Sequence, residues 1–349
     1  MRAGLAAVLA GTASAMMPPA LLSPARAEPP RVLSYSGVFE DNYTAAVVAP
    51  FAAAGTPAQY VGGDSSASML GQLRTQKTDP QLDVVIMDTT TAALACSEGL
   101  VEPLTPAMLP VLEQLDPQAR AAGGACGPGV TFDHLVVVYD TAKVVPAPTS
   151  LQVLWDPAWK RRVAVDAPPN IIGLALTAVL AHSISGDWKK ADGAFDRLKA
   201  LGPAVQTFQP QPDPYTLVLN GTLAAATGWN ARGQLYRDRS AGKLGVMLPS
   251  EGTAFQINTI NLVRGAKNRD AALAFIAYAL SAPAQKAFTE RMFYAPTNTM
   301  AQVDPAAAAR TAASPENKAR VVPIDWPEML RLRDGWNQRW RREVISAGR

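Results

Sequence analysis

Short apolar runs of strand length alternate with segments of helical apolar spacing in the first part of the chain. Strands are expected at residues 31–36, 59–61, 82–87 and 134–139, and helices at 42–54, at 67–76 and from residues 88–91 to 98. Residues 82–87 are apolar except for Asp83, as is typical of a strand in a sheet covered on both faces. Because parallel neighbouring strands need a crossover helix between them, this order predicts an α/β fold.

The alternation restarts after the proline-rich residues 145–149. Strands are expected at 162–165, 223–229, 245–248 and 257–263, and helices at 171–182, 188–201, 272–280, 284–292 and 325–346. The alanine-rich residues 306–313 are expected to form a surface loop or helix. The restart predicts two lobes joined by two or three crossing segments. Residues 28–135 and 256–300 would form lobe one, 138–252 lobe two, and 301–349 a C-terminal helical segment.

The N-terminus has the layout of a secretory signal. Met1-Arg2 gives a positive start, residues 3–17 are apolar and small, and Ala25-Arg26-Ala27 offers a cleavage site before Glu28. The alternative is a buried N-terminal helix, which the Gly, Pro and Ser residues in the segment disfavour. The apolar core is too short for a stable membrane span. We therefore expect export to the periplasm with cleavage near Ala27.

Charge and composition narrow the range of partners. The 349-residue chain has 17% charged residues and a formal net charge of +3. Its body has no basic patch interleaved with aromatic residues, so nucleic acid is not an expected partner. The arginine-rich residues 331–342 are interpreted as the exposed face of a terminal helix. We expect the protein to be a monomer.

The chain has two cysteines, Cys96 and Cys126. In an oxidising compartment this even count predicts one disulfide. The alternative is two separate buried thiols. Together with only His134 and His182, these cysteines make no recognisable metal site, and no cofactor is expected.

A ligand site is expected in the cleft between the lobes, where carboxyl ends of strands meet helix starts. The candidates at these positions are Tyr35, Ser36, Ser65, Ser66, Asp88, Thr89, Thr90, Asp166, Asn170, Ile171, Trp229, Asn230, Glu251, Phe255, Gln256, Asn258 and Tyr294. Ser and Asp at helix starts are also ordinary capping residues. The free N–H groups of such starts would equally suit a carboxylate, phosphate or phosphonate. Trp229 is either a core residue or a wall on which a ligand stacks.

Two segments carry a resemblance to a known family. Residues 242–298 combine a strand ending in Pro249-Ser250-Glu251-Gly252, a returning apolar strand and two helices, and residues 154–160 read Leu-Trp-Asp-Pro-Ala-Trp-Lys. This resembles the periplasmic solute-binding proteins of ABC importers, in the branch with polyamine, ferric-iron and thiamine binders. The resemblance implies a two-lobe, hinged periplasmic-binding-protein fold of type II. It also implies capture of a solute for an inner-membrane permease, without chemistry on the solute.

The resemblance also bears on the solute. In polyamine binders, acidic residues hold the ammonium groups and aromatic residues stack on the methylene chain. Trp229 falls on one aromatic position, but Gln256 and Asn258 stand where those binders have Trp and Asp, and Ala167 and Asn170 also replace acidic residues. A buried polycation without paired anions is unstable. We therefore expect a small organic anion or zwitterion, such as an amino acid-like, aminophosphonate or carboxylate compound, with a diamine or polyamine as the alternative.

Two other functions are weaker. The iron binders use neighbouring tyrosines, whereas Tyr294 stands alone. Gly63-Asp64-Ser65 resembles the start of a lipase/esterase family, which would make the protein a secreted hydrolase. That chemistry needs a histidine near the C-terminus, and no histidine follows His182. We therefore do not expect an enzyme.

Overall fold

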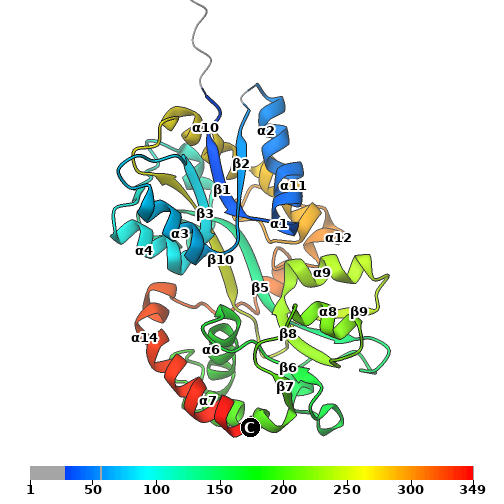
Figure 1. Cartoon of the computed structure of the whole chain (residues 1–349). Coiled ribbons are helices and arrows are strands. Elements are labelled where there is room, and N and C mark those ends of the chain that lie inside the picture. The colour runs from blue at the N-terminus through cyan, green and yellow to red at the C-terminus, as the bar shows by residue number, and fades with distance from the viewer. Residues whose placement is uncertain (1–27, 56, 349) are drawn as a thin grey trace, which may run out of the picture.

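The computed structural model describes residues 28–55 and 57–348, which fold into two α/β lobes, one above the other in Figure 1. The predicted signal segment 1–27 lies outside the described residues. The strands are β1 Arg31–Tyr35, β2 Gln59–Gly63, β3 Val84–Asp88, β4 Val101–Glu102, β5 Gly129–Asp140, β6 Val163–Ala164, β7 Val205–Thr207, β8 Ala225–Trp229, β9 Leu244–Met247 and β10 Phe255–Val263. The α-helices are α1 Val38–Tyr43, α2 Ala49–Ala53, α3 Ser66–Thr75, α4 Thr89–Ser97, α5 Pro117–Ala121, α6 Ile171–Ser185, α7 Asp192–Leu201, α8 Pro214–Leu219, α9 Asn230–Arg239, α10 Arg269–Ala279, α11 Ala282–Met292, α12 Pro305–Ala308, α13 Pro315–Lys318 and α14 Trp326–Arg339.

One long strand, β5, belongs to both lobes. Hydrogen-bonded neighbours follow the order β2-β1-β3-β10-β5-β8-β6-β7. Residues 129–134 of β5 pair with β10 in the first lobe, and residues 135–140 pair with β8 and β9 in the second. The strands β1, β2 and β3 are parallel, as predicted, whereas β10 returns antiparallel between β3 and β5.

Alternate residues of each strand pack on opposite faces of the sheet, because side chains alternate along a strand. In the first lobe, Val84 and Ile86 face the main cluster with Phe39, Phe275 and Phe288, whereas Val85 and Met87 face Met69 and Leu70 of α3. Helices therefore cover both faces, which explains why this segment reads as almost continuously apolar.

The structure joins Cys96 at the end of α4 to Cys126 before β5, so the predicted disulfide is present. Leu100 and Val101 pack beside it in the buried cluster under α3 and α4. The bridge closes a sequence separation of 30 residues within the first lobe.

The predicted helices differ from the observed ones in several regions, two of which border the site. The predicted helix at 42–54 begins earlier, at Val38, and passes through a π-helical turn, Thr44–Val48, before α2. Pro50 has no N–H to donate back along the helix, which accounts for a local irregularity here. The helices α8 and α9 were not predicted. Both lie in the second lobe and border the cleft described below.

The C-terminal segment crosses back from the first lobe to the second. Thr253 donates its N–H to Arg320 O and accepts from Val322 N, so this segment runs beside the crossing between β9 and β10. It continues into α14, whose Trp336 lies against Trp188 and Phe195 of the second lobe. None of the helices in the described part of the chain is long and apolar enough to span a membrane.

Candidate functional site: a polar cleft between the lobes

A cavity of about 750 Å³ lies between the two lobes. Candidates that line it are Tyr35, Ser36, Ser65, Ser66, Asp88, Thr90, Asp166, Asn170, Ile171, Trp229, Gln256, Asn258 and Tyr294. The rest of the lining includes Asp64, Asp133, Asp213, Tyr215, Arg232 and Arg333. Its size is in the range of small-molecule sites.

The first-lobe wall is a connected hydrogen-bond network. The Tyr35 hydroxyl lies 2.7 Å from Ser66 Oγ and donates to Asn258 Oδ1 at 3.0 Å. Asn258 Oδ1 also accepts from Gln256 Nε2 at 2.7 Å. Burial, together with the nearby Asp88 charge, raises the pKa of the Tyr35 hydroxyl, so it stays protonated. This network is a set of neutral donors and acceptors held in fixed positions beside the Asp88 carboxylate.

Side-chain caps occupy three helix starts that face the cleft, those of α3, α4 and α6. Ser65 Oγ accepts from Ser68 N at the start of α3, and Asn170 Oδ1 accepts from Ile172 N at the start of α6. At α4, Asp88 Oδ1 accepts from the backbone N–H of Thr90 and of Thr91. The capping interpretation therefore describes these residues, and the carboxylate at the α4 start disfavours an anionic ligand there.

Asp166 is an acidic group of the second-lobe wall with unused bonding capacity. It follows β6, and its Oδ1 accepts from Asn170 Nδ2 at 3.1 Å. Its Oδ2 is buried and has no hydrogen-bond partner among the described residues. Burial raises the pKa of this carboxyl to about 7, although the bond from Asn170 opposes the shift. A buried charged oxygen without a partner is costly, and a ligand donor would remove that cost.

Asp133 lies where β5 passes from one lobe to the other. Its Oδ1 accepts from Ala231 N at 3.0 Å and from His134 N at 2.8 Å, so it ties the start of α9 to β5. Burial raises the pKa of the Asp133 carboxyl to about 7, against the opposing effect of these bonds and of the Arg232 charge. Burial lowers the pKa of neighbouring His134 to about 3, which keeps that imidazole neutral.

Two arginines bring positive charge to the same cavity. Arg232, in the first turn of α9, is exposed and takes part in no ion pair or side-chain hydrogen bond in the described part of the chain. Arg333 comes from α14. Against them stand five aspartates, Asp64, Asp88, Asp133, Asp166 and Asp213. Because Asp88 and Asp213 cap their own helices, the carboxylates with capacity for a ligand are Asp64, Asp133 and Asp166.

Aromatic rings complete the walls. Trp229 is half-buried at the end of β8, and its backbone N–H and carbonyl both bond to the Tyr215 hydroxyl. Tyr294 is stacked on Phe288 with ring centroids 5.3 Å apart. Burial raises the pKa of the Tyr294 hydroxyl well above its usual value, so it is a neutral group. Trp229 is thus placed both against the core and along the cavity.

Four candidates do not line this cavity, and their side chains have other partners in the structure. Thr89 Oγ1 donates to Ala122 O, and Asn230 Nδ2 donates to Phe293 O and Arg310 O. Glu251 accepts from Ser150 Oγ and Leu151 N. Phe255 stacks on Phe132, with centroids 4.5 Å apart. On β10 the reason is the strand pleat: Gln256 and Asn258 share the cleft face, and Phe255 points away.

Several cleft residues were missed by the sequence reasoning. Asp133 is an acidic residue inside an apolar run, which is a readable signal of a buried functional carboxylate. Arg232 follows Trp229 by three positions, and Arg333 belongs to the cluster that was interpreted as a solvated helix face. Asp213 and Tyr215 lie at the start of the unpredicted helix α8.

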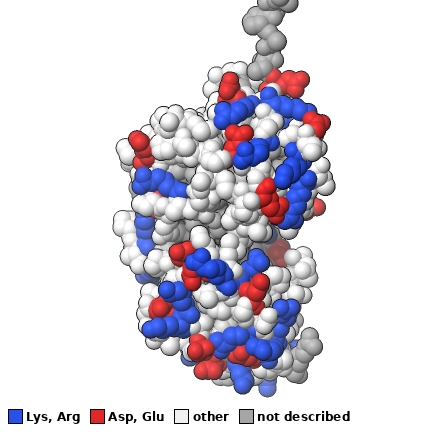
Figure 2. Space-filling view, turned by 90° about the vertical axis from the view of Figure 1, so that its left-hand side faces the viewer, with Lys and Arg blue, Asp and Glu red and all other residues white. Residues whose placement is uncertain are grey.

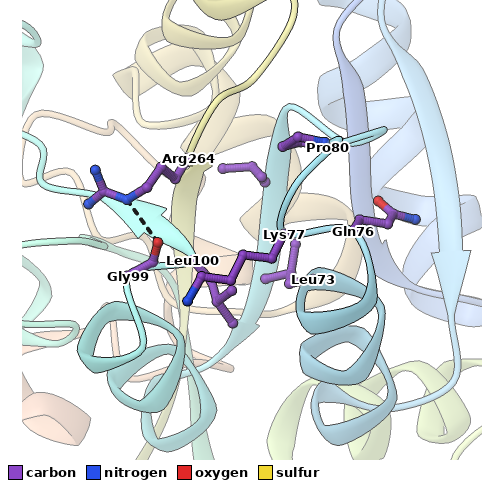
Figure 3. A pocket seen from close by; sticks show the side chains of 8 residues that line it. Leu73, Gln76, Lys77, Pro80, Gly99, Leu100 and Arg264 are labelled. Atoms are coloured by element: carbon purple, nitrogen blue, oxygen red, sulfur yellow. Dashed lines mark hydrogen bonds between the residues drawn. The ribbon is translucent and has the colours of Figure 1, made fainter.

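A smaller cavity of about 80 Å³ lies at the C-terminal ends of α3 and α4, away from the helix starts that face the cleft (Figure 3). Its two cations already bond to backbone carbonyls: Arg264 Nε donates to Gly99 O at 2.8 Å, and Lys77 Nζ donates to Glu98 O at 3.2 Å. It has room for little more than water. Figure 2 shows acidic and basic side chains intermixed on the visible face, without a broad field of one sign.

The family model for bacterial extracellular solute-binding proteins matches residues 46–318. The chain belongs to this family. It is 27% identical over 302 residues to the spermidine/putrescine-binding periplasmic protein of Escherichia coli, covering 81% of this chain and 79% of that protein. It is 25% identical over 275 residues to the gamma-aminobutyric acid-binding protein of Pseudomonas aeruginosa, covering 76% of each chain.

The fold is that of solved two-lobe periplasmic binding proteins. One from Actinobacillus pleuropneumoniae, with exogenous fructose-6-phosphate bound, has a TM-score of 0.72 and 19% identity, covering 90% of this chain and 98% of that one. This extracellular solute-binding protein is therefore the substrate-binding component of an ABC transporter, which captures a small solute and delivers it to a permease. Its relatives of this class are transport proteins rather than enzymes.

Proposed function

We propose that the solute is a small zwitterion that carries an ammonium group at one end and an acid group at the other. The observation that carries this proposal is the presence in one cavity of two opposite charges without partners among the described residues: the buried Asp166 Oδ2 and the Arg232 guanidinium. Asp166 would accept from the ammonium group and Arg232 would hold the acid group, while Trp229 would stack on the carbon chain.

The position of Asp166 supports its role as the ammonium partner. It is the one carboxylate of the cavity with a buried oxygen that lacks a partner among the described residues. An ammonium group has donors for this oxygen and for neighbouring acceptors. Arg232 is proposed as the partner of the acid group because side-chain caps already occupy the starts of α3, α4 and α6.

A relative named for binding gamma-aminobutyric acid supports the same class of solute. We therefore choose γ-aminobutyrate as the test compound, with putrescine and butyrate as compounds that lack its acid and its amine. Calorimetric titration of the exported protein should show binding of γ-aminobutyrate and weaker binding of the other two. If butyrate binds as tightly as γ-aminobutyrate, the proposal that the solute is a zwitterion is overturned.

Matched variants sharpen this test. Asp166→Asn and Arg232→Gln should each weaken γ-aminobutyrate binding by roughly 10- to 100-fold, the loss expected for one charged hydrogen bond. Asp196→Asn on α7 and Arg237→Gln on α9 remove the same charges from exposed positions outside the cavity. These two controls should leave the affinity unchanged.

The diamine or polyamine alternative rests on Asp64 and Asp133, which add acidic groups to the cavity beyond Asp166. These residues weaken the sequence argument that the cleft lacks carboxylates. A relative named for binding spermidine and putrescine favours the same alternative. If putrescine binds more tightly than γ-aminobutyrate, and Asn258→Asp strengthens it further, the alternative replaces the zwitterion.

We also propose that the chain is exported to the periplasm, with a signal peptide cleaved near Ala27, and acts there as a monomer. Relatives named as periplasmic proteins support this. We retain the lobe boundaries 28–135 with 256–300 and 138–252. Mass spectrometry of the exported protein would check the first residue, and light scattering would check the monomer.

A further inference from the structure

The C-terminal helix α14 is anchored on the second lobe. Trp340, which follows it, is fully buried, and its Nε1 donates to Thr177 Oγ1 of α6 at 2.9 Å. Arg339 pairs with Asp192 of α7 at 2.7 Å, and its guanidinium lies 4.0 Å from the centroid of the Phe195 ring. These contacts hold α14 at a fixed position relative to α6 and α7.

The same helix reaches the first lobe. It packs near α4, whose start carries Asp88, Thr90 and Thr91 of the cavity wall. Figure 1 shows the upper end of α14 below α4, on the side of the cleft opposite α9. The helix therefore stands at the opening between the lobes.

Arg333 differs from the other arginines of α14. Arg331 pairs with Glu328, and Arg339 pairs with Asp192 and Glu343. Among the described residues, Arg333 has only its exposed neighbour Asp334 as a partner, with Nε 3.4 Å from Oδ1. Arg333 is also the residue of α14 that lines the cavity. Its Nη groups donate no hydrogen bond to the described residues, so a guanidinium with free donors faces the cleft.

We infer that α14 is a wall of the binding site and that Arg333 is a specificity-determining residue, which selects solutes carrying an acid group. The inference rests on the proposed function. A guanidinium presents a planar fork of donors that matches a carboxylate or phosphonate, and it repels a second ammonium group. Arg333 would thus lower the affinity of an aspartate-rich cleft for diamines.

The test uses the full exported chain with γ-aminobutyrate and putrescine as probes. Arg333→Gln should weaken γ-aminobutyrate by about 10-fold and tighten putrescine by about 3-fold, as expected when one solvent-accessible charge is removed. Arg331→Gln removes the same charge from the same helix away from the cavity and should change neither affinity. Arg333→Lys keeps the charge and should retain the preference for the acid, and thermal melting checks that each variant is folded.

The outcomes separate the inference from the proposed function. If wild type binds putrescine instead of γ-aminobutyrate, the zwitterion fails, and tighter putrescine binding by Arg333→Gln still supports Arg333. If wild type binds γ-aminobutyrate and Arg333→Gln matches Arg331→Gln, the inference alone is overturned. If Arg333→Gln weakens the binding of both probes equally, Arg333 stabilises the closed lobes without recognising the acid group. This result would also overturn the inference. Absence of binding by both probes overturns both.

Discussion

At the scale of single residues, the cleft contains two carboxyl groups whose pKa values burial raises to about 7, Asp133 and Asp166. A raised pKa means that the folded protein holds these protons more tightly than the unfolded chain does. These groups therefore stabilise the folded state relative to the unfolded chain below about pH 4, and this contribution is lost as the pH rises through about 7.

The affinity for the ligand should also depend on pH, but it should rise with pH, whereas the contribution to stability falls. An ammonium ligand needs the ionised carboxylate, so γ-aminobutyrate should bind more tightly at pH 8 than at pH 5.5, with the rise centred near pH 7. The variant Asp166→Asn should flatten most of this rise. Calorimetric titrations across that range would measure it, and an affinity that is independent of pH in wild type would argue against Asp166 as the partner.

Trp229 is the second residue with a separable role. If it is a wall of the site, Trp229→Ala should weaken γ-aminobutyrate by up to roughly 30-fold, the value of an accessible stacking or cation–π contact. Its contacts with the core should then contribute little, whereas truncation of a core tryptophan costs about 3–5 kcal/mol. One melting curve and one titration of the variant distinguish the two. A large loss of stability with unchanged affinity would assign Trp229 to the core.

At the scale of elements, much of the fold was readable because buried strands and amphipathic helices leave strong periodic signals. The parallel strands β1, β2 and β3 and the returning β10 lie where the apolar runs predicted them. Helix α9 was missed because Asn230, Ala231, Gly233 and Gln234 form its buried face. Small and polar residues leave no apolar stripe, so its period is invisible in the sequence.

The site was less readable for a related reason. A strand end predicts proximity to the cleft but not the direction of each side chain, so Gln256 and Phe255 could not be separated without the register of β10. Arg333 belongs to α14, which begins at Trp326, far along the chain from the end of β10 at Val263, and only the tertiary fold brings it to the cleft.

The disulfide gives a prediction at this scale. Replacing Cys96 and Cys126 by serine should lower the free energy of unfolding by about 3 kcal/mol, from the chain entropy of a loop of this size. Binding should be unchanged, because the bridge lies at the end of α4 away from Asp88. Denaturant unfolding measures the first quantity and calorimetry the second. Equal stability of the serine variant would show that the bridge does not constrain the unfolded chain.

At the scale of the whole molecule, the two lobes meet at β5, at the crossing before β10 and at the C-terminal segment. Because only a small number of segments cross between the lobes, a hinge motion can close the lobes on a solute. Small-angle scattering should therefore show a smaller radius of gyration with saturating γ-aminobutyrate than without. An unchanged scattering profile at saturation would contradict the hinge.

The most direct measurement of the central claim is a crystal structure of the protein with γ-aminobutyrate. We expect the ammonium group within hydrogen-bond distance of Asp166 Oδ2, the carbon chain on the Trp229 ring and the carboxylate towards Arg232. A compound bound in the reverse orientation, with its carboxylate against Asp133 or the capped helix starts, or one bound outside this cavity, would contradict the assignment of a zwitterion to opposite charges of the cleft.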